Sequence, residues 1–204
     1  MYIKCMQRRN TMIRLATESD IPAMLAIYGP YVENTTHTFE YEVPSREVFL
    51  RRFQHITTQY PWLVWEEDGV VLGYAYGSTM FERAAYSWCA EASIYLAPQI
   101  QGRGIGKKLY TALENLLWLQ GYRLIYAIIT QENTGSRAFH AAMGYRVVAE
   151  LPDCGLKFGR WLGIVYMEKC AEIGEIPSKL PDSFLSIVNN DRKIFEILDI
   201  LSLS

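Results

Sequence analysis

The chain has 204 residues, of which half are hydrophobic and 21% are charged, with a formal net charge of −2 at pH 7. A chain of this length is expected to form one domain that buries about 70% of its unfolded surface without disulfides or metals. The nearly balanced charge removes the general electrostatic case for nucleic acid or an anionic membrane as a partner.

The cysteines and the N-terminus indicate the compartment. Cys5, Cys89, Cys154 and Cys170 form no C-x-x-C pair and no metal-ligand spacing with a histidine. The N-terminus lacks the apolar core of a signal peptide, and no apolar run is long enough to cross a bilayer. We therefore expect reduced thiols, no metal, no membrane segment and a cytoplasmic location.

The N-terminal third predicts a strand and two helices. A short strand is expected at 12–16. A helix follows, with Ser19 or Asp20 as its N-cap, and is expected to end at Gly29-Pro30. The second helix begins at Pro44-Ser45.

The centre of the chain predicts antiparallel strands. Apolar strands at 62–65 and 70–76 are joined through Asp68-Gly69, a strong hairpin signal, and a long third strand follows at 86–96. After a glycine-rich turn the chain alternates helix and strand. The expected elements are a helix from Ile105 to a cap at Gly121, a strand at 124–129, a helix from Asn133-Thr134 to Gly144, and strands at 145–151 and 163–168. This order predicts an α/β sheet that mixes antiparallel and parallel pairs.

The glycine-rich turn, Gln101-Gly-Arg-Gly-Ile-Gly-Lys107, connects a strand to a helix. Glycines keep side chains away from the backbone, so N–H groups at the start of the helix can bind an anion, which the helix dipole also favours. The spacing matches neither the dinucleotide fingerprint G-x-G-x-x-G nor the P-loop. The three glycines alone are equally consistent with a pyrophosphate site and with a tight turn that binds nothing.

The turn fits the pattern Q/R-x-x-G-x-G/A, in which the chain resembles the GNAT superfamily of N-acetyltransferases. The resemblance implies an α/β fold with a mixed, mainly antiparallel central sheet flanked by helices and splayed central strands, over residues 12–169. It also implies acetyl-CoA as co-substrate. The cofactor-binding positions that it assigns are Ile94, Tyr95, Leu96, Gln101, Gly102, Arg103, Gly104, Ile105, Gly106, Lys107, Asn133 and Ser136.

Four stretches are similar to one branch of that superfamily, the phosphinothricin and methionine sulfoximine acetyltransferases. They are 35–40 (Thr-Thr-His-Thr-Phe-Glu), 83–88, Glu91 with 93–96, and 155–161 (Gly-Leu-Lys-Phe-Gly-Arg-Trp). The resemblance implies a homodimer that acetylates the amine of a small, amino-acid-like substrate. Acetyltransfer to another small amine and acyl-CoA sensing without turnover are alternatives. A nucleotide-binding oxidoreductase is disfavoured because half of the dinucleotide fingerprint is missing.

Glu91 and His140 are the catalytic candidates. An aliphatic amine has a pKa of about 10.4, so at pH 7 fewer than about one molecule in a thousand is a free nucleophile, and a base must remove its proton. Glu91, among apolar neighbours, suits that role, and an exposed strand residue or an ion pair with Arg83 is its alternative. His140, where many members have a tyrosine, either exchanges protons with the substrates or is a structural histidine bonded to a backbone carbonyl.

The proposed acceptor site draws on two loops. Arg83 is able to bind a substrate carboxylate bidentately, and Arg160 is a weaker candidate. Phe39 either lines the substrate pocket or anchors its loop in the core. The substrate-binding candidates are Phe39, Phe81, Glu82, Arg83 and Trp88.

The C-terminal extension, residues 170–204, departs from the family. Residues 194–201 are too apolar to be left in water, so the extension is expected to be partly helical and to dock on this chain or across a dimer. A poorly ordered tail is the alternative.

Overall fold

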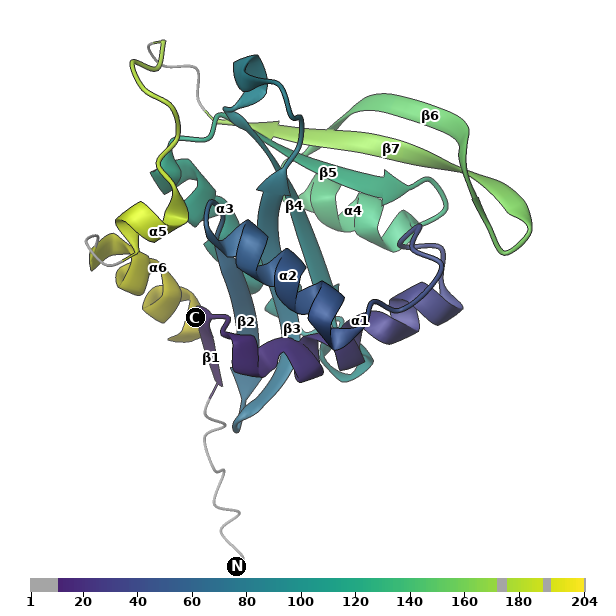
Figure 1. Ribbon diagram of the computed structural model, residues 1–204, viewed down its shortest axis with the longest axis horizontal. Coiled ribbons are helices and arrows are strands. Elements are labelled where there is room, and N and C mark those ends of the chain that lie inside the picture. The colour runs from purple at the N-terminus through teal and green to yellow at the C-terminus, as the bar shows by residue number, and fades with distance from the viewer. Residues whose placement is uncertain (1–10, 172–175, 189–191, 204) are drawn as a thin grey trace, which may run out of the picture.

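The computed structural model describes residues 11–171, 176–188 and 192–203, so the expectations for Cys5 and the first ten residues lie outside it. Seven strands form one sheet in the order β1-β2-β3-β4-β5-β7-β6 (Figure 1). The strands are β1 Thr11–Leu15, β2 Trp62–Glu67, β3 Val70–Thr79, β4 Cys89–Leu96, β5 Leu124–Thr130, β6 Arg146–Lys157 and β7 Arg160–Cys170. Among the strand pairs of the described residues, only β4–β5 is parallel, which confirms a mixed, mainly antiparallel sheet.

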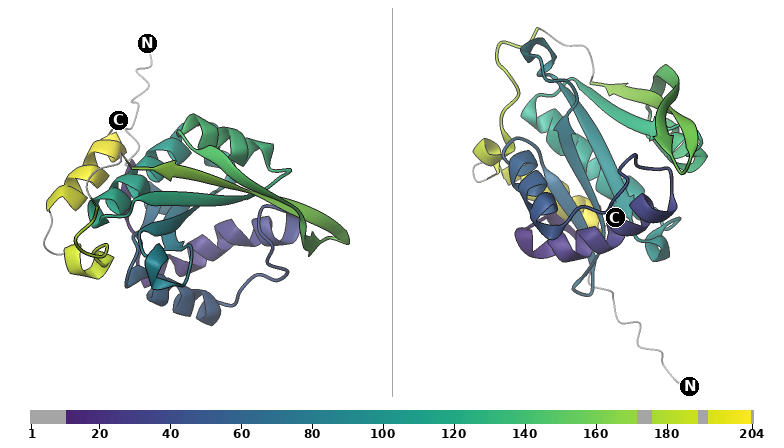
Figure 2. Two further views of the ribbon diagram at one scale, coloured as in Figure 1. Left: turned by 90° about the horizontal axis from the view of Figure 1, so that it is seen from above. Right: turned by 45° about the vertical axis from the view of Figure 1, so that its right-hand side comes forward.

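Helices cover both faces of the sheet, as Figure 2 shows. They are α1 Ile21–Asn34, α2 Arg46–Thr57, α3 Ile105–Gln120, α4 Thr134–Ala142, α5 Phe184–Ile187 and α6 Arg192–Leu203, with short 3-10 turns at Glu18–Asp20, Ala84–Tyr86 and Pro98–Ile100. Helices α1 and α2 bury an aromatic-rich cluster around Phe49 and Trp62. On the opposite face, α3 buries Leu109, Leu113 and Leu116 completely. The 3.6-residue spacing of these leucines explains why α3 forms the larger core.

Several predicted boundaries hold. Asp68 and Gly69 have φ of 50° and 82° in the β2–β3 turn, the two positive values that a type I′ hairpin needs. Gly121 ends α3 with φ of 98°. The side chain of Ser45 caps α2 by accepting a hydrogen bond from the amide of Val48, 3.3 Å away.

Helix α1 does not end at Gly29-Pro30 as predicted but continues to Asn34 with Pro30 inside it. A proline inside a helix removes one backbone hydrogen bond, at a cost of about 3 kcal/mol. The continuation buries Val32 completely and lets the hydroxyl of Tyr31 donate to the carbonyl of Leu96, 2.7 Å away. Tertiary contacts of the last turn therefore override the local stop signal.

Three strand predictions were also wrong in extent. The third strand begins at Cys89 rather than Tyr86, because 84–86 forms a 3-10 turn. The last two strands are longer than predicted and meet at a turn in which Phe158 and Gly159 have φ of 51° and 74°. A register shift between Leu151 and Gly155 accommodates Pro152 and Asp153 within β6.

The C-terminal extension packs on the same chain. Ile194 and Leu198 of α6 and Phe184 of α5 are buried in the core beneath α3. The hydroxyl of Ser202 accepts a hydrogen bond from the amide of Ile13 in β1, 2.8 Å away, so α6 lies along the outer edge of that strand.

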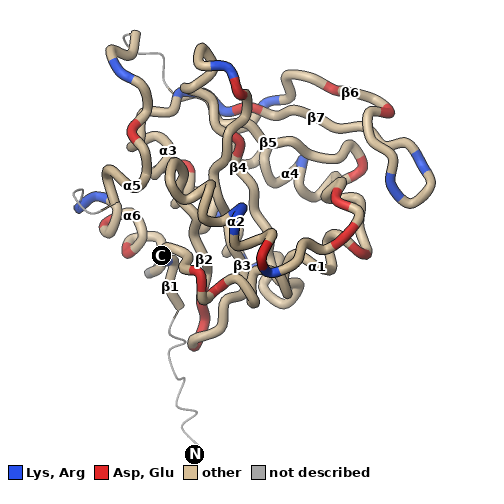
Figure 3. The backbone as a smooth tube through the Cα atoms, in the orientation of Figure 1, with Lys and Arg blue, Asp and Glu red and all other residues tan. Residues whose placement is uncertain are grey.

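Charged residues of both signs are scattered over the fold (Figure 3), in keeping with the small net charge. Across the described ranges, none of the helices has the length and hydropathy needed to span a bilayer.

Candidate functional site

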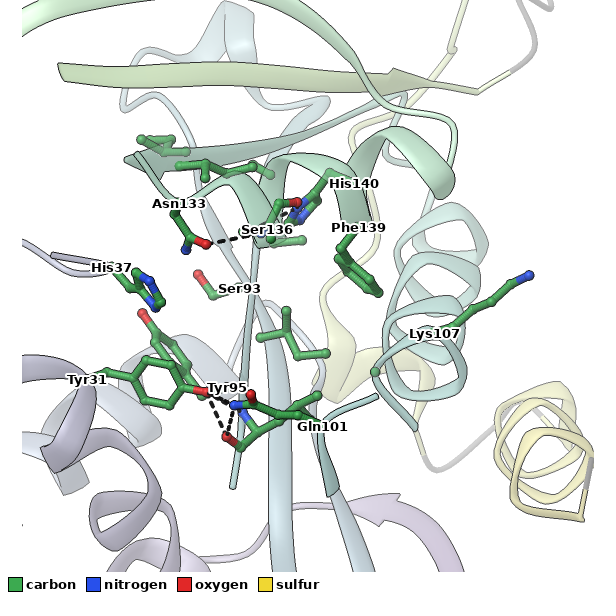
Figure 4. Close-up of a pocket in the computed structure, with 18 of the residues that line it drawn as sticks. Tyr31, His37, Ser93, Tyr95, Gln101, Lys107, Asn133, Ser136, Phe139 and His140 are labelled. Carbon is green, nitrogen blue, oxygen red and sulfur yellow. Dashed lines mark hydrogen bonds between the residues drawn. The ribbon is translucent and has the colours of Figure 1, made fainter. Parts of the chain in front are cut away.

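A cavity of about 590 Å³ opens between β4 and β5, at the N-terminal ends of α3 and α4 (Figure 4). It is largely lined by the second half of β4, the glycine-rich turn and α4. The lining residues are Tyr31, His37, Ala92, Ser93, Ile94, Tyr95, Leu96, Gln101, Gly102, Gly104, Gly106, Lys107, Ala127, Ile128, Ile129, Asn133, Gly135, Ser136, Phe139 and His140.

The cavity exists because two neighbouring strands diverge. β4 and β5 pair only from Cys89 to Glu91, although β4 continues to Leu96 along β3. Beyond Glu91 the edge of β4 that would face β5 carries backbone groups directed into the gap. The carbonyl of Leu96 accepts from the Tyr31 hydroxyl there, and the side-chain amide of Gln101 lies 3.1 Å from that hydroxyl. The predicted splayed strands are confirmed, with a main-chain edge exposed to a ligand.

The glycine-rich turn forms one end of the cavity. Gly102 and Gly104 have φ of 74° and 79°, a conformation that other residues rarely adopt. They bring the chain to the start of α3 at Ile105, where the first amides have no partner within the helix. A Cβ on Gly106 would lie 3.1 Å from Leu96 Cδ1, so a glycine lets the helix approach β4. Unpaired amides, the helix dipole and Lys107 on the cavity lining fit the diphosphate of acetyl-CoA.

Helix α4 forms the opposite wall. The side chain of Asn133 caps it by accepting from the amide of Ser136, 3.1 Å away. His140 Nδ1 lies 2.8 Å from the carbonyl of Ser136, so this nitrogen carries the hydrogen, because a carbonyl only accepts. His140 Nε2 then accepts from the hydroxyl of the buried Tyr110, 3.1 Å away. Burial lowers the pKa of His140, so the ring is neutral at pH 7.

Glu91 occupies the last paired position before the strands diverge. Its neighbours Ala90 and Ala92 belong to the core beneath α3, so its side chain points toward the α1–α2 face. Burial raises the pKa of Glu91 to about 7. Within the described ranges its carboxyl has no ion pair or hydrogen bond, and Arg83 does not pair with it. The group is therefore poised to exchange a proton near neutral pH.

Most predicted cofactor residues line the cavity, with two exceptions. The guanidinium of Arg103 is held by the buried carboxyl of Glu67, 2.7 Å away, and Ile105 is buried in the core. The predicted substrate residues lie outside the lining. Phe39 packs on the backbone of β6 at Gly155, Trp88 is half-buried, and the remaining three, Phe81, Glu82 and Arg83, are exposed on the β3–β4 connection.

Some lining residues are not predicted from the sequence, chiefly Tyr31, His37, Ser93 and Phe139. Tyr31 was missed because the helix was expected to end at Pro30. His37 lay within the stretch 35–40, but only Phe39 was considered there. The alternation of side chains along β4 would have placed Ser93 on the same face as Glu91.

Comparisons with known proteins agree with this geometry. Residues 13–165 match the family model described as the acetyltransferase (GNAT) domain. The chain is 33% identical over 84% of its length to phosphinothricin N-acetyltransferase of Streptomyces viridochromogenes, covering 93% of that protein. It is 32% identical over 76% of its length to L-methionine sulfoximine/L-methionine sulfone acetyltransferase of Salmonella typhimurium, covering 92% of that protein.

A solved structure extends the agreement to three dimensions. The GNAT superfamily phosphinothricin acetyltransferase from Sinorhizobium meliloti, in complex with acetyl-CoA, is 35% identical and covers 84% of this chain and 93% of its own, with a TM-score of 0.77. The family match spans the sheet, the glycine-rich turn and the cavity, so the chain belongs to the GNAT family of acetyl-CoA-dependent N-acetyltransferases.

Proposed function

We propose that the acetyl acceptor is the amine of a small amino acid of the phosphinothricin or methionine sulfoximine type, and that Glu91 is the general base. The observation that carries the proposal is the position of Glu91: a half-buried carboxyl without a counter-ion among the described residues, one residue before the cavity lining begins, with a pKa of about 7. The similarity to enzymes named for those two substrates supports the acceptor class.

In the proposed reaction the acetyl group moves directly from acetyl-CoA to the amine. Glu91 accepts a proton from the ammonium, directly or through a water, and the free amine attacks the thioester carbon. A carboxylate with a pKa near 7 is a stronger base than an ordinary glutamate and is still half ionised at neutral pH. Amides on the free edge of β4, around Ile94, are suited to stabilise the oxygen of the thioester as it gains charge, and one such donor is typically worth ~3 kcal/mol.

His140 is proposed as the second catalytic residue. Because its ring is neutral, it would first take up the second proton of the attacking nitrogen and then pass a proton to the departing sulfur. Its Nδ1–H lies 3.3 Å from the hydroxyl of Ser136, and both residues line the cavity. Because both ring nitrogens already have partners within the protein, a structural role is the competing interpretation. A His140→Gln variant distinguishes them, since a catalytic role predicts a fall in kcat without a fall in melting temperature.

Arg83 is proposed to bind the carboxylate of the acceptor. It has no ion pair among the described residues and lies on the loop that leads into β4. The ring of Phe81 packs edge-to-face against Tyr126, the residue that pairs with Glu91 on β5, with ring centroids 5.9 Å apart. Glu82 and Trp88 belong to the same loop, and Phe39, which packs against β6 at Gly155, is the remaining residue of the proposed acceptor site. An amino acid would then place its amine near Glu91 and its carboxylate near Arg83.

The test is thiol release from acetyl-CoA with a panel of amines. Phosphinothricin and methionine sulfoximine should be acetylated faster than amines of similar size that lack a carboxylate. Arg83→Gln should raise the acceptor KM more than the acetyl-CoA KM. If simple amines react as fast as the two amino acids, the acceptor class is wrong and the enzyme acetylates another small amine.

We also propose a homodimer, which the exposed apolar side chains of the β6–β7 hairpin support. Leu156, Phe158 and Trp161 are 45%, 56% and 63% exposed, more than isolated surface positions require. A second copy of the chain would cover them. Sedimentation of the wild type against a Phe158→Asp/Trp161→Asp variant tests the proposal, which a monomeric wild type would contradict.

A further inference from the structure

Two stretches quoted in the sequence analysis, 35–40 and 155–161, lie against each other although more than a hundred residues separate them. We call residues 36–41, which include most of the first stretch, the acceptor-side segment. The second forms the tip of the β6–β7 hairpin, which projects beside this segment in Figure 1. Three kinds of contact join them.

The first contact is steric. The ring of Phe39 rests on the backbone of β6 at Gly155, where an added Cβ would lie 2.1 Å from Cε2 and 2.5 Å from Cδ2 of the ring. Real Cβ atoms do not come this close to another carbon, so a side chain at 155 and the observed position of Phe39 exclude each other. A glycine is needed here for space.

The second contact is polar and buried. The ammonium of Lys157, only 2% exposed, donates to the carbonyl of Thr38, 2.7 Å away. Within the described ranges no carboxylate lies within ion-pair distance of this ammonium, and burial lowers the pKa of Lys157. The hydroxyl of Tyr41 donates to the carbonyl of Leu156. The ammonium also lies 5.0 Å from the centroid of the Phe158 ring in the same hairpin. Because a buried ammonium needs its hydrogen-bond partner, Lys157 is expected to hold the Thr38 carbonyl, and with it the loop, in one place.

The third contact lies at the other end of the segment. Arg160 donates to the carboxylate of Glu132 from Nη1 and Nη2, at 3.0 and 2.8 Å. Glu132 accepts in turn from the hydroxyl of Thr36, 2.6 Å away. The hydroxyl of Thr130 donates to the carbonyl of Thr36. The start of the segment is thereby tied to β5 and to the residue before the cap of α4.

The segment that is held in this way carries His37 to the cavity. Figure 4 places His37 and Lys107 on opposite sides of it, with Ser93 and Asn133 nearer to His37. The glycine-rich turn beside Lys107 is the end suited to the diphosphate. The segment therefore bounds the other end, where the acyl group and the acceptor would meet.

We propose that the β6–β7 hairpin tip positions the acceptor-side segment, so that Gly155, Lys157 and Arg160 act as positioning residues for acceptor binding without touching the acetyl donor's diphosphate. This inference rests on the proposed function, because it needs an acceptor that binds at the His37 end of the cavity. It assigns a role to both sequence stretches that the catalytic residues leave unexplained.

A double-mutant cycle on Phe39 and Gly155 tests the proposal. Gly155→Ala alone should raise the acceptor KM about tenfold, because a displacement of about 1 Å in a binding wall has effects of that order or larger, while the Kd for acetyl-CoA changes less than about twofold. In a Phe39→Ala background the ring is absent, so adding Gly155→Ala should change the acceptor KM by less than about twofold. Additive effects of the two substitutions would overturn the proposal.

Gly159→Ala is the matched control in the same hairpin. Gly159 has φ of 74° and an added Cβ would meet nothing within 4 Å, so this variant strains the turn without touching the segment. It should lower the melting temperature and leave the acceptor KM unchanged. An equal rise in acceptor KM for both glycine variants would mean that general loss of stability, and not positioning, is responsible.

Lys157→Met removes the bond to Thr38 and keeps the bulk of the side chain. It should raise the acceptor KM with little change in kcat, and an unchanged KM would contradict the assignment.

The double-mutant cycle on Phe39 and Gly155 uses whichever amine the wild type acetylates fastest. Failure of phosphinothricin-like acceptors would therefore refute the proposed substrate class, whereas additivity on a working substrate would refute the positioning role.

Discussion

The two ends of the cavity are built differently. The donor end is made largely of main chain: the glycine-rich turn, the first amides of α3 and the free edge of β4. The proposed acceptor end is made of side chains from separate places, with Glu91 on β4, Arg83 on a loop, and Phe39 held against β6. One end depends on how the backbone is folded, and the other on which side chains are attached to it.

This difference indicates which end sets affinity for a shared substrate and which sets selectivity. Backbone amides recognise a diphosphate in any family member with the same turn. Side chains on loops are free to vary while the scaffold stays fixed. Substitutions at the donor end should therefore change acetyl-CoA binding, whereas those at the acceptor end should change turnover and acceptor binding.

The largest expected effect belongs to Glu91. Glu91→Gln should lower kcat by about 10²- to 10⁴-fold, the usual contribution of a general base, because the amide does not accept the proton. The Kd for acetyl-CoA, from isothermal titration, should remain within about twofold of the wild type. A variant that keeps wild-type turnover would remove Glu91 from the mechanism.

A smaller effect is expected for Gly104→Ala at the donor end. Alanine at φ of 79° is strained by about 1–2 kcal/mol, so either the turn moves or the strain persists. We expect the Kd for acetyl-CoA to rise about tenfold, with the acceptor KM unchanged.

Gly69→Ala provides its control. Gly69 has φ of 82° in the β2–β3 hairpin, outside the cavity lining, and an added Cβ there also meets nothing within 4 Å. Gly69→Ala should strain the backbone as much as Gly104→Ala does, but at a position away from the proposed acetyl-CoA site. Equal weakening of acetyl-CoA binding in both variants would show that the turn has no special role.

The pH dependence of activity should follow Glu91. With a pKa of about 7, the reactive carboxylate is lost below pH 7, so kcat/KM should fall about tenfold per pH unit there and level off above. A profile that stays flat down to pH 5 would contradict the assignment.

Stability should change with pH in the opposite direction. The pKa of Glu91 is raised from 4.5 to about 7 on folding, so the native state holds a proton that the unfolded state has lost within that window. Stability contributed by this group is therefore lost as pH rises from about 4.5 to 7, by up to about 3 kcal/mol. Glu91→Gln should melt above the wild type at pH 8 and close to it at pH 4.5.

The smallest effect on the site is expected from the C-terminal extension. Leu198→Ala should destabilise the fold by about 2–5 kcal/mol, because Leu198 is 5% exposed in the core beneath α3. Phe195→Ala, at a position that is 57% exposed, should change stability by less than about 1 kcal/mol. Thermal unfolding measures both, and the kinetic constants of the folded fraction should match the wild type at both ends of the cavity.

The donor end could be predicted from the sequence because its physics is local. A strand, three alternate glycines and a helix within about fifteen residues fix both the turn and the direction of its amides. Ten of the eleven cavity-lining residues in the stretches 94–107 and 133–136 are predicted from the sequence, with Gly135 the exception. Arg103 was predicted to bind the cofactor but does not line the cavity, because its guanidinium is paired with Glu67 at the end of β2. No local pattern in the sequence reveals that pairing.

The rest of the site depends on contacts between distant segments. Pro30 is a sound stop signal in isolation, and only the burial of Val32 and the bond from Tyr31 to Leu96 explain why the helix continues. His37 lines the cavity from a segment that contacts a hairpin more than a hundred residues away in the chain. Sequence patterns named these stretches but did not indicate that they touch.

The position of α6 along β1 has a consequence for how this sheet meets other molecules. An edge strand offers a row of unpaired backbone groups to which a further strand can add. At β1 the helix occupies that margin, and Ser202 takes one of its amides. Lateral growth of the sheet is therefore confined to the β6 margin at the far end, so self-association by strand addition can extend in one direction only and stops at a pair.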